Sequence, residues 1–260
     1  MNETEKELIQ EQRHNTVVKS NKMIQNSRFS LSTQQQKILL YIISQIKPTD
    51  TEIKECTISI VDYCNVCGIN THSDIYRTIR KQIKEISDKS IWVEKSKGEH
   101  ILLRWIEKTR ISERAGTITV KLDEDLYPYL IQLKEQFTIY ELINILNFKC
   151  KYSIRLYEYL KSIQYDKTKA YTTTIDIDTF QQLLESGYKH FKDFNTRVLK
   201  PAEKEINLYS DIFFEYCLIN HGRKITDIEI TVRTKDVLNR MRANARAENQ
   251  LNEGLTKDEQ

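Results

Sequence analysis

One block of sequence occurs twice in this chain of 260 residues, with its copies about 120 positions apart. The segment TISIVDY at 57–63 corresponds to TIDIDTF at 174–180, and Gly68 corresponds to Gly187. Flanking blocks match in the same order, 39–43 with 156–160 and 84–86 with 204–206. Repetition at a fixed period indicates that each copy is one structural unit, so we expect a duplicated domain of about 110–120 residues.

Each copy has the element order of a winged helix-turn-helix. In the first copy, a Ser-x-x-Gln capping box at 32–35 begins a helix over about 33–46, the alternating segment TISI follows as a strand, and a brief helix ends at Gly68. An amphipathic helix over 73–88 and a hairpin turning at 97–98 complete it. The second copy gives a helix over 153–164, a strand over 173–177, helices over 179–186 and 190–208, and a hairpin turning at 220–223. The pattern predicts an α+β, helix-rich fold of two tandem winged helix-turn-helix domains related by internal duplication.

The two ends of the chain differ from its middle. Net charges of −2 on residues 1–13 and −3 on 247–260 leave +8 on the rest of a chain whose total is only +3. Because both ends lack apolar periodicity, we expect a flexible acidic N-terminus and a flexible C-terminal tail. The expected divisions are 1–18 for the N-terminus, 19–146 for the first winged-helix domain with a bridging helix over 126–146, 147–234 for the second domain, and 235–260 for the tail.

The basic charge falls on the second helix of each expected helix-turn-helix, the element that lies in the major groove of DNA. Opposite the apolar positions of these helices lie Arg77, Arg80, Lys81 and Lys84 in the first copy, and Arg197, Lys200 and Lys204 in the second. Arg77 with Arg197, Arg80 with Lys200 and Lys84 with Lys204 share one offset of 120. A charged stripe is usually only a solvated helix face. The repetition at fixed register, the glycine turn and the following hairpin favour DNA contact here.

The residue types suggest different roles within these faces. Arginine can donate two hydrogen bonds to guanine, whereas lysine mostly binds phosphates, so we expect base contacts from Arg77 and Arg197. Asn195 and Thr196 are possible secondary readers. Three weaker candidates lie elsewhere: Arg223 and Lys224 in the second hairpin turn, where a plain surface turn is equally consistent, and Lys151 at a helix start that favours a phosphate.

Signals of catalysis and of metal binding are missing from the sequence. No glycine precedes a lysine, which excludes a P-loop, and no two histidines lie within two positions of each other. Cys64 and Cys67 have the spacing of zinc ligands, but too few further ligands lie nearby, which favours buried thiols. We therefore expect no catalytic residues, no metal ligands, no cofactor and no enzymatic activity.

The apolar runs, the N-terminal residues and the cysteines indicate in which compartment the protein is found. The longest apolar run, 38–43, has six residues, far fewer than the ~20 that a membrane helix needs. The first fifteen residues lack the apolar core of a signal peptide, and five irregularly spaced cysteines suit a reducing compartment. We expect a cytoplasmic protein with no membrane partner.

Four segments resemble plasmid replication initiators of the Rep_3 type, the iteron-binding Rep proteins. They are NKMIQNSRFSLSTQQQKILLYIISQI (21–46), LYPYLIQLKEQFTIYEL (126–142), KYSIRLYEYLKS (151–162) and FNTRVLKPAEKEIN (194–207). The resemblance implies tandem winged helices that bind direct repeats (iterons) of double-stranded DNA at an origin, with the second domain as main reader and the first adding dimerisation and accessory contacts. It also implies recruitment of a host initiator and a replicative helicase, a monomer–dimer equilibrium, and repression of its own gene by the dimer. A winged-helix transcriptional repressor with no initiator role, and a protein-binding winged-helix adaptor, remain alternatives.

Overall fold

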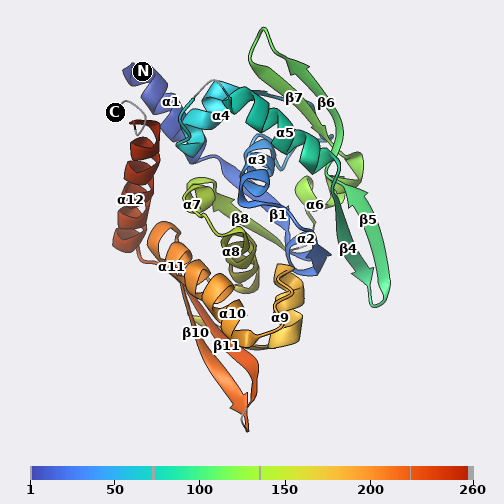
Figure 1. Ribbon diagram of the computed structural model, residues 1–260, viewed down its shortest axis with the longest axis vertical. Helices are drawn as coiled ribbons and strands as arrows, with labels where there is room; N and C mark the ends of the chain where they lie inside the picture. The colour runs from blue at the N-terminus through green and yellow to red at the C-terminus, as the bar shows by residue number, and fades with distance from the viewer. Residues whose placement is uncertain (1, 72–73, 135, 223, 257–260) are drawn as a thin grey trace.

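The computed structural model describes residues 2–71, 74–134, 136–222 and 224–256 (Figure 1). Its helices are α1 Glu3–Arg13, α2 Asn21–Asn26, α3 Thr33–Ile43, α4 Ile60–Cys67, α5 Ile75–Ser87, α6 Tyr127–Leu130, α7 Ile143–Leu146, α8 Lys151–Ile163, α9 Ile177–Leu184, α10 Phe191–Phe194, α11 Lys200–Tyr209 and α12 Val237–Thr256. Its strands are β1 Thr16–Ser20, β2 Ser27–Arg28, β3 Cys56–Ser59, β4 Ser90–Ser96, β5 Glu99–Arg104, β6 Ile106–Ser112, β7 Thr117–Leu122, β8 Phe137–Glu141, β9 Tyr171–Asp176, β10 Ile212–His221 and β11 Lys224–Thr234. Within these ranges, no helix is both long enough and apolar enough to cross a bilayer.

Local signals place the helices of the first copy. Ser32 and Gln35 form the expected capping box at the start of α3, each side chain bonding the backbone of the other residue. Helix α4 ends at Gly68, whose φ of 64° is left-handed and therefore suits glycine. Helix α5 buries the isoleucines at 75, 79, 83 and 86 along one face. The helices expected from the repeat are confirmed to within a few residues.

The sheets of the two copies are built differently. In the second copy, β10, β11 and β9 form one antiparallel sheet, so the strand before the helix-turn-helix pairs with the hairpin that follows it. In the first copy the hairpin β4–β5 pairs with β2 instead, and β3 pairs with β7 of an additional hairpin, β6–β7. The repeat therefore preserves the order of the shared elements while the strand partners change.

The expectation of a bridging helix over 126–146 is wrong. Pro128 lies in the first turn of α6, a helix of four residues, and Gln132 then takes a left-handed φ of 48°. The chain continues as strand β8, which pairs with β1 from Thr16↔Glu141 to Ser20↔Phe137. Apolar residues at every second position of 137–141 are typical of a strand rather than a helix, and pairing with a strand about 120 residues away completes it.

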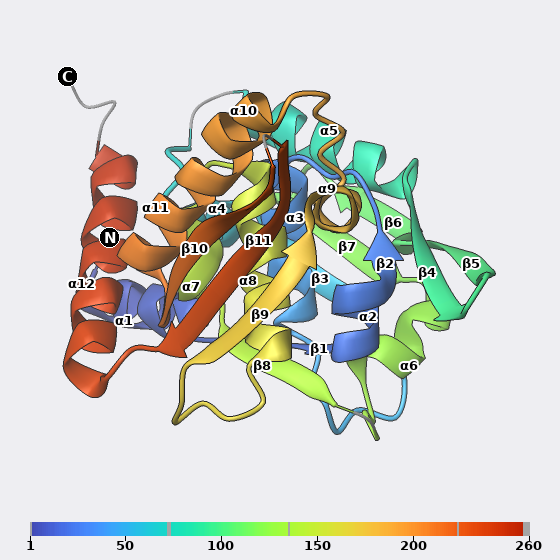
Figure 2. The ribbon, with the colours of Figure 1, turned by 90° about the horizontal axis from the view of Figure 1, so that it is seen from below.

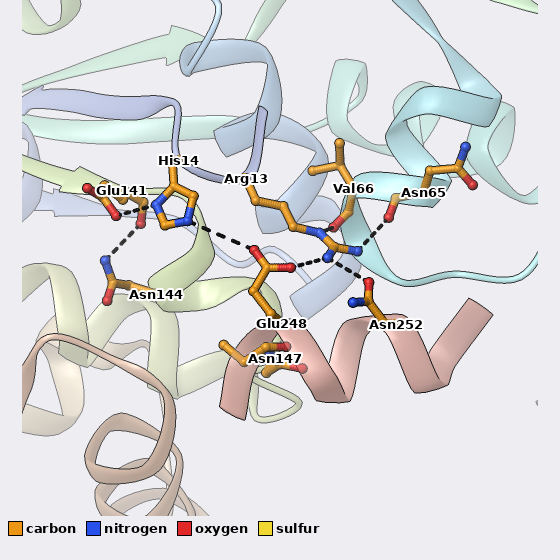
Figure 3. A network of polar contacts seen from close by, with 10 residues as sticks. Arg13, His14, Asn65, Val66, Glu141, Asn144, Asn147, Glu248 and Asn252 are labelled. Atoms are coloured by element: carbon orange, nitrogen blue, oxygen red, sulfur yellow. Dashed lines mark hydrogen bonds and ion pairs between the residues drawn. The ribbon is translucent and has the colours of Figure 1, made fainter. Parts of the chain in front are cut away.

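Near both ends of the chain the described residues are helical, in α1 and α12, contrary to the expected flexible termini. Arg13, at the end of α1, is buried and donates to the carbonyls of Asn65 and Val66 at 2.9 and 3.0 Å (Figure 3). It also pairs with Glu248 and donates to Asn252, both on α12. Helices α1, α4 and α12 are thus joined through one guanidinium, and α12 also buries Ala243, Ala247 and Leu251 at helical spacing.

Helix α8 lies between the two winged-helix copies (Figure 1), and its buried polar side chains contact both of them. Glu158 accepts two hydrogen bonds of 2.9 Å from Lys19 of β1 and one of 2.6 Å from Tyr140 of β8. Arg155, whose pKa burial lowers to about 10, donates to Ser27 of the first copy and to the Leu183 carbonyl of the second. The domains therefore share a core rather than being joined by a linker.

Helix α12 lies so close to α4 that an alanine at Gly254 is expected to destabilise the protein. A Cβ there would lie 2.2 Å from the Gly68 carbonyl oxygen. Gly→Ala inside a helix normally stabilises by about 1 kcal/mol, but this clash should reverse the sign and cost about 1–3 kcal/mol. Urea unfolding measures the change, with Ala245→Gly on the exposed face of α12 as the control that follows ordinary helix propensity. A more stable Gly254→Ala protein would contradict the observed packing.

Candidate nucleic-acid interface

The second helix of the second copy is one continuous helix with a π-helical turn in its middle. Helix α10 leads into the π-helical turn Asn195–Leu199, and α11 follows from Lys200. Pro201 has no N–H to donate to the carbonyl of Arg197, four residues earlier, which accounts for the altered turn. The freed Arg197 carbonyl instead lies 3.8 Å from the thiol of Cys150. The turn contains three of the expected DNA-contacting residues.

Three cations of this helix are exposed and have no acidic partner among the described residues. Thr196, Arg197, Lys200 and Lys204 are exposed, and among the described residues none of the three cations has a carboxylate within 4 Å. Buried apolar residues anchor the opposite side, including Phe194, Val198 and Ile206. Asn195 differs from its neighbours because its side-chain oxygen already accepts a 2.5 Å hydrogen bond from Tyr216 of β10. The helix therefore presents unneutralised positive charge to solvent.

The cations of α5 are also exposed, but each faces a carboxylate. Arg77 lies 3.0 Å from Asp74, Arg80 lies 2.5 Å from Glu113, Lys81 lies 3.9 Å from Glu85, and Lys84 lies 2.9 Å from Asp88. The hydrogen bond and charge of Asp88 raise the pKa of Lys84. These pairs are exposed and therefore weak, so DNA phosphates can compete with them. The two matched faces nonetheless differ in the charge they offer.

The sequence contains a signal for three of these acidic partners, which our sequence interpretation missed. Asp74 lies three residues before Arg77, Glu85 four after Lys81, and Asp88 four after Lys84, the spacings at which helix side chains meet. Glu113 carries no such signal, because it lies in the turn of the additional hairpin β6–β7. Tertiary folding alone brings it to Arg80.

Both second helices lie on the same side of the molecule. Figure 2 shows α5 and α10 along its upper side, while β8 and the loop between α8 and β9 occupy the lower side. The exposed Arg77 and Lys81 belong to α5, and the exposed Arg197 lies in the π-helical turn that directly follows α10. The arrangement suits two adjacent contacts on one extended partner.

The weaker candidates have mixed surroundings. Lys224 is exposed at the start of β11, and Arg223 lies outside the described residues. Lys151 has its Nζ 4.7 Å from the ring centre of Tyr152. The backbone N–H groups of Lys149 and Cys150 beside it already donate to Glu205 of α11, at 2.9 and 3.2 Å. A phosphate at this helix start would have to displace that carboxylate.

The two cysteines of α4 are buried thiols, as the sequence analysis favoured. Burial raises the pKa of Cys64 to about 12 and that of Cys67 to about 11, which keeps both protonated near neutral pH. Within the described part of the chain, no three His, Cys, Asp or Glu side chains are grouped so as to hold a metal ion.

Two winged-helix domains, each with a basic second helix on a common side, define the class: a tandem winged-helix protein. The chain belongs to the family of initiator replication proteins. The family model described as "Initiator Replication protein, WH1" matches residues 16–161, and that described as "Initiator Rep protein, WH2" matches 176–232. The resemblance stated from four segments and the expected fold class are both confirmed.

Individual proteins agree with this assignment. A replication initiation protein of Escherichia coli is 30% identical over 195 residues, which cover 72% of this chain and 60% of that relative. The chain therefore corresponds to little more than half of that protein. Among solved structures, the Pi initiator protein in complex with iteron DNA has a TM-score of 0.71 at 19% identity, covering 86% of this chain and 99% of that one. A structure of domains 2 and 3 of RctB has a TM-score of 0.51 at 12% identity, covering 80% and 85%.

Proposed function

We propose that the protein is a sequence-specific DNA-binding initiator of plasmid replication that binds direct repeats at an origin and has no catalytic activity. The observation that carries this proposal is the free basic face of Arg197, Lys200 and Lys204 on the second helix of a winged helix. Family membership supports it, as does similarity in fold to an initiator whose structure contains iteron DNA.

The two domains have different shares of DNA binding in this proposal. The second domain, 147–234, is the main reader, because its helix cations have no carboxylate partners among the described residues. The first domain, 19–146, adds accessory contacts through α5, whose cations must first leave Asp74, Glu85, Asp88 and Glu113. Recruitment of a host initiator and a helicase, dimerisation through the first domain and repression of its own gene complete the proposed role, in the cytoplasm.

Footprinting on DNA that flanks the gene tests this function. Protection of several direct repeats beside an AT-rich tract is the expected result. Protection of only an inverted repeat would favour a transcriptional repressor that uses the same helix. Failure to bind any DNA at low salt, where a basic face binds even without specificity, would favour a protein-binding adaptor.

Lys200→Ala is expected to weaken binding to repeat DNA and to random DNA by similar factors. A lysine that neutralises one phosphate releases about one counterion, so the slope of log K against log salt should flatten by about one. Titrations at several salt concentrations measure this slope. Lys169→Ala is the matched control, since Lys169 lies in the loop between α8 and β9 on the other side of the molecule (Figure 2). Loss of specific binding alone would contradict a phosphate role for Lys200.

A further inference from the structure

Strand β8 has one paired edge and one open edge. Asn21 N–H donates to the Gln136 carbonyl and Leu142 N–H donates to the Asn15 carbonyl, both at 2.9 Å. In this antiparallel register the even-numbered residues of β8 direct their backbone groups toward β1, and the odd-numbered residues direct theirs away. Phe137 and Ile139 therefore point N–H and C=O groups outward, and among the described residues neither makes a backbone hydrogen bond there.

A groove follows this open edge. Two pockets of about 400 Å³ each lie end to end along β8 and share Ile139, Lys161 and Lys167 as lining residues. The loop after α8 and the start of α12 form the facing wall, with Tyr165 in one pocket and Val237 and Met241 in the other. The elements that line the groove, β8, the loop after α8 and the start of α12, lie on the lower side in Figure 2, away from α5 and α10 on the upper side.

The groove is lined by exposed apolar side chains. Phe137 and Ile139 of β8 are 47% and 40% exposed, and Tyr165, Val237 and Met241 are each more than 60% exposed. An exposed apolar cluster beside unpaired strand hydrogen-bonding groups is the combination that extended peptides use when they add a strand to a sheet.

The charge around the groove selects the kind of peptide. Of its two acidic lining residues, Asp211 pairs with Lys161 at 2.6 Å, and Glu141 lies 2.7 Å from His14, which offsets the carboxylate only when the imidazole is protonated. Lys167 and Arg240 are exposed, and neither has an ion pair among the described residues. The lining cations Lys161, Lys167 and Arg240 outnumber the carboxylates Glu141 and Asp211, so the net charge of the groove is positive, which attracts carboxylates and would repel the same surface of a second copy.

We propose that the open edge of β8 binds a partner protein through an extended segment in which apolar and acidic residues alternate. The segment pairs with the backbone of Phe137 and Ile139. Its apolar side chains cover the exposed cluster, and its carboxylates face Lys167 and Arg240. This docking surface is independent of DNA binding, because it uses none of the basic residues of α5 or α11.

A synthetic peptide tests the proposal directly. The probe is a fluorescent, end-blocked heptapeptide, Asp-Val-Glu-Ile-Asp-Val-Glu, measured by anisotropy with the full chain at low salt. We expect it to bind at least tenfold more tightly than a block peptide of the same composition, and than a version N-methylated at alternate amides, which cannot pair as a strand. Hydrogen exchange at 137–141 should slow on binding. Equal binding of the peptides, no detectable binding, or unchanged exchange would overturn the proposal.

Protein variants locate the site. Ile139→Pro removes only an outward N–H, so β1 pairing should persist while peptide affinity falls at least tenfold; Ile139→Val is its control. Lys167→Glu with Arg240→Glu should also weaken binding at least tenfold, and Lys169→Glu, in the same loop as Lys167, is the control for one charge reversal outside the groove. Unchanged affinity in both site variants would overturn the proposal, as would a wild-type dimer that Ile139→Pro dissociates, because a second copy would then occupy the edge.

DNA binding, measured separately, keeps the two proposals distinguishable. Ile139→Pro should bind repeat DNA like the wild type, which also shows that it is folded. If the wild-type chain bound the peptide but no DNA, the proposed function would fail while the docking surface stood.

Discussion

Arg197→Ala is expected to weaken binding to origin repeats by about 5- to 150-fold, equivalent to about 1–3 kcal/mol, and to relax discrimination at one base pair. Arg197 lies in the π-helical turn between α10 and α11, is exposed, and has no carboxylate partner among the described residues. Mobility-shift titrations on the natural repeat and on single-base variants measure both effects.

Two further variants control this result. Arg197→Lys keeps the charge but loses the two-pronged hydrogen bonding, so we expect it to restore binding to random DNA without restoring discrimination. Arg77→Ala changes the equivalent residue of the first domain, which already pairs with Asp74, and should cost less. A larger loss from Arg77→Ala would reverse the proposed order of the domains.

Lys19→Met is expected to lower the free energy of unfolding by about 3–5 kcal/mol, because it leaves a buried carboxylate without its counter-ion. The side chains of Lys19 and Glu158 are 3% and 2% exposed, so water does not replace the lost ammonium. Burial lowers the pKa of Lys19, while the charge of Glu158 opposes that shift. Urea unfolding measures the loss of stability.

The double variant Lys19→Met with Glu158→Leu separates charge from packing. Replacing a whole buried pair by apolar residues of similar size is often neutral, so the double variant should recover part of the stability lost in the single one. The recovery is incomplete because the buried Tyr140 hydroxyl, which donates to Glu158, loses its acceptor. If the two variants are equally unstable, the shape of the site matters more than its charge.

Local sequence patterns predicted the parts of this molecule that depend on near neighbours. The capping box at Ser32 and the left-handed turn at Gly68 set the bounds of α3 and α4. Isoleucines at helical spacing oriented α5 with its basic face outward. The N-terminal helix was missed although the sequence contains a signal for it: Asn2 and Glu5 form a capping box at the start of α1.

Other features depend on partners far away in the chain. Strand β8 forms because β1 pairs with it, and α12 is ordered against the rest because Arg13 bonds Glu248 and Asn252, more than 230 residues away. The pairing of Arg80 with Glu113 likewise requires that a hairpin tip reach α5.

The sequence by itself therefore determined the duplicated winged helices, their order and their basic faces, because helix periodicity, caps and turns act over a few residues. Only the tertiary structure decided that Glu113 meets Arg80, that α1 and α12 bond each other through Arg13, and that β8 keeps an open edge. Each of these depends on distances between residues remote in sequence, which hydrophobic burial and long-range hydrogen bonding set together and which no local spacing encodes.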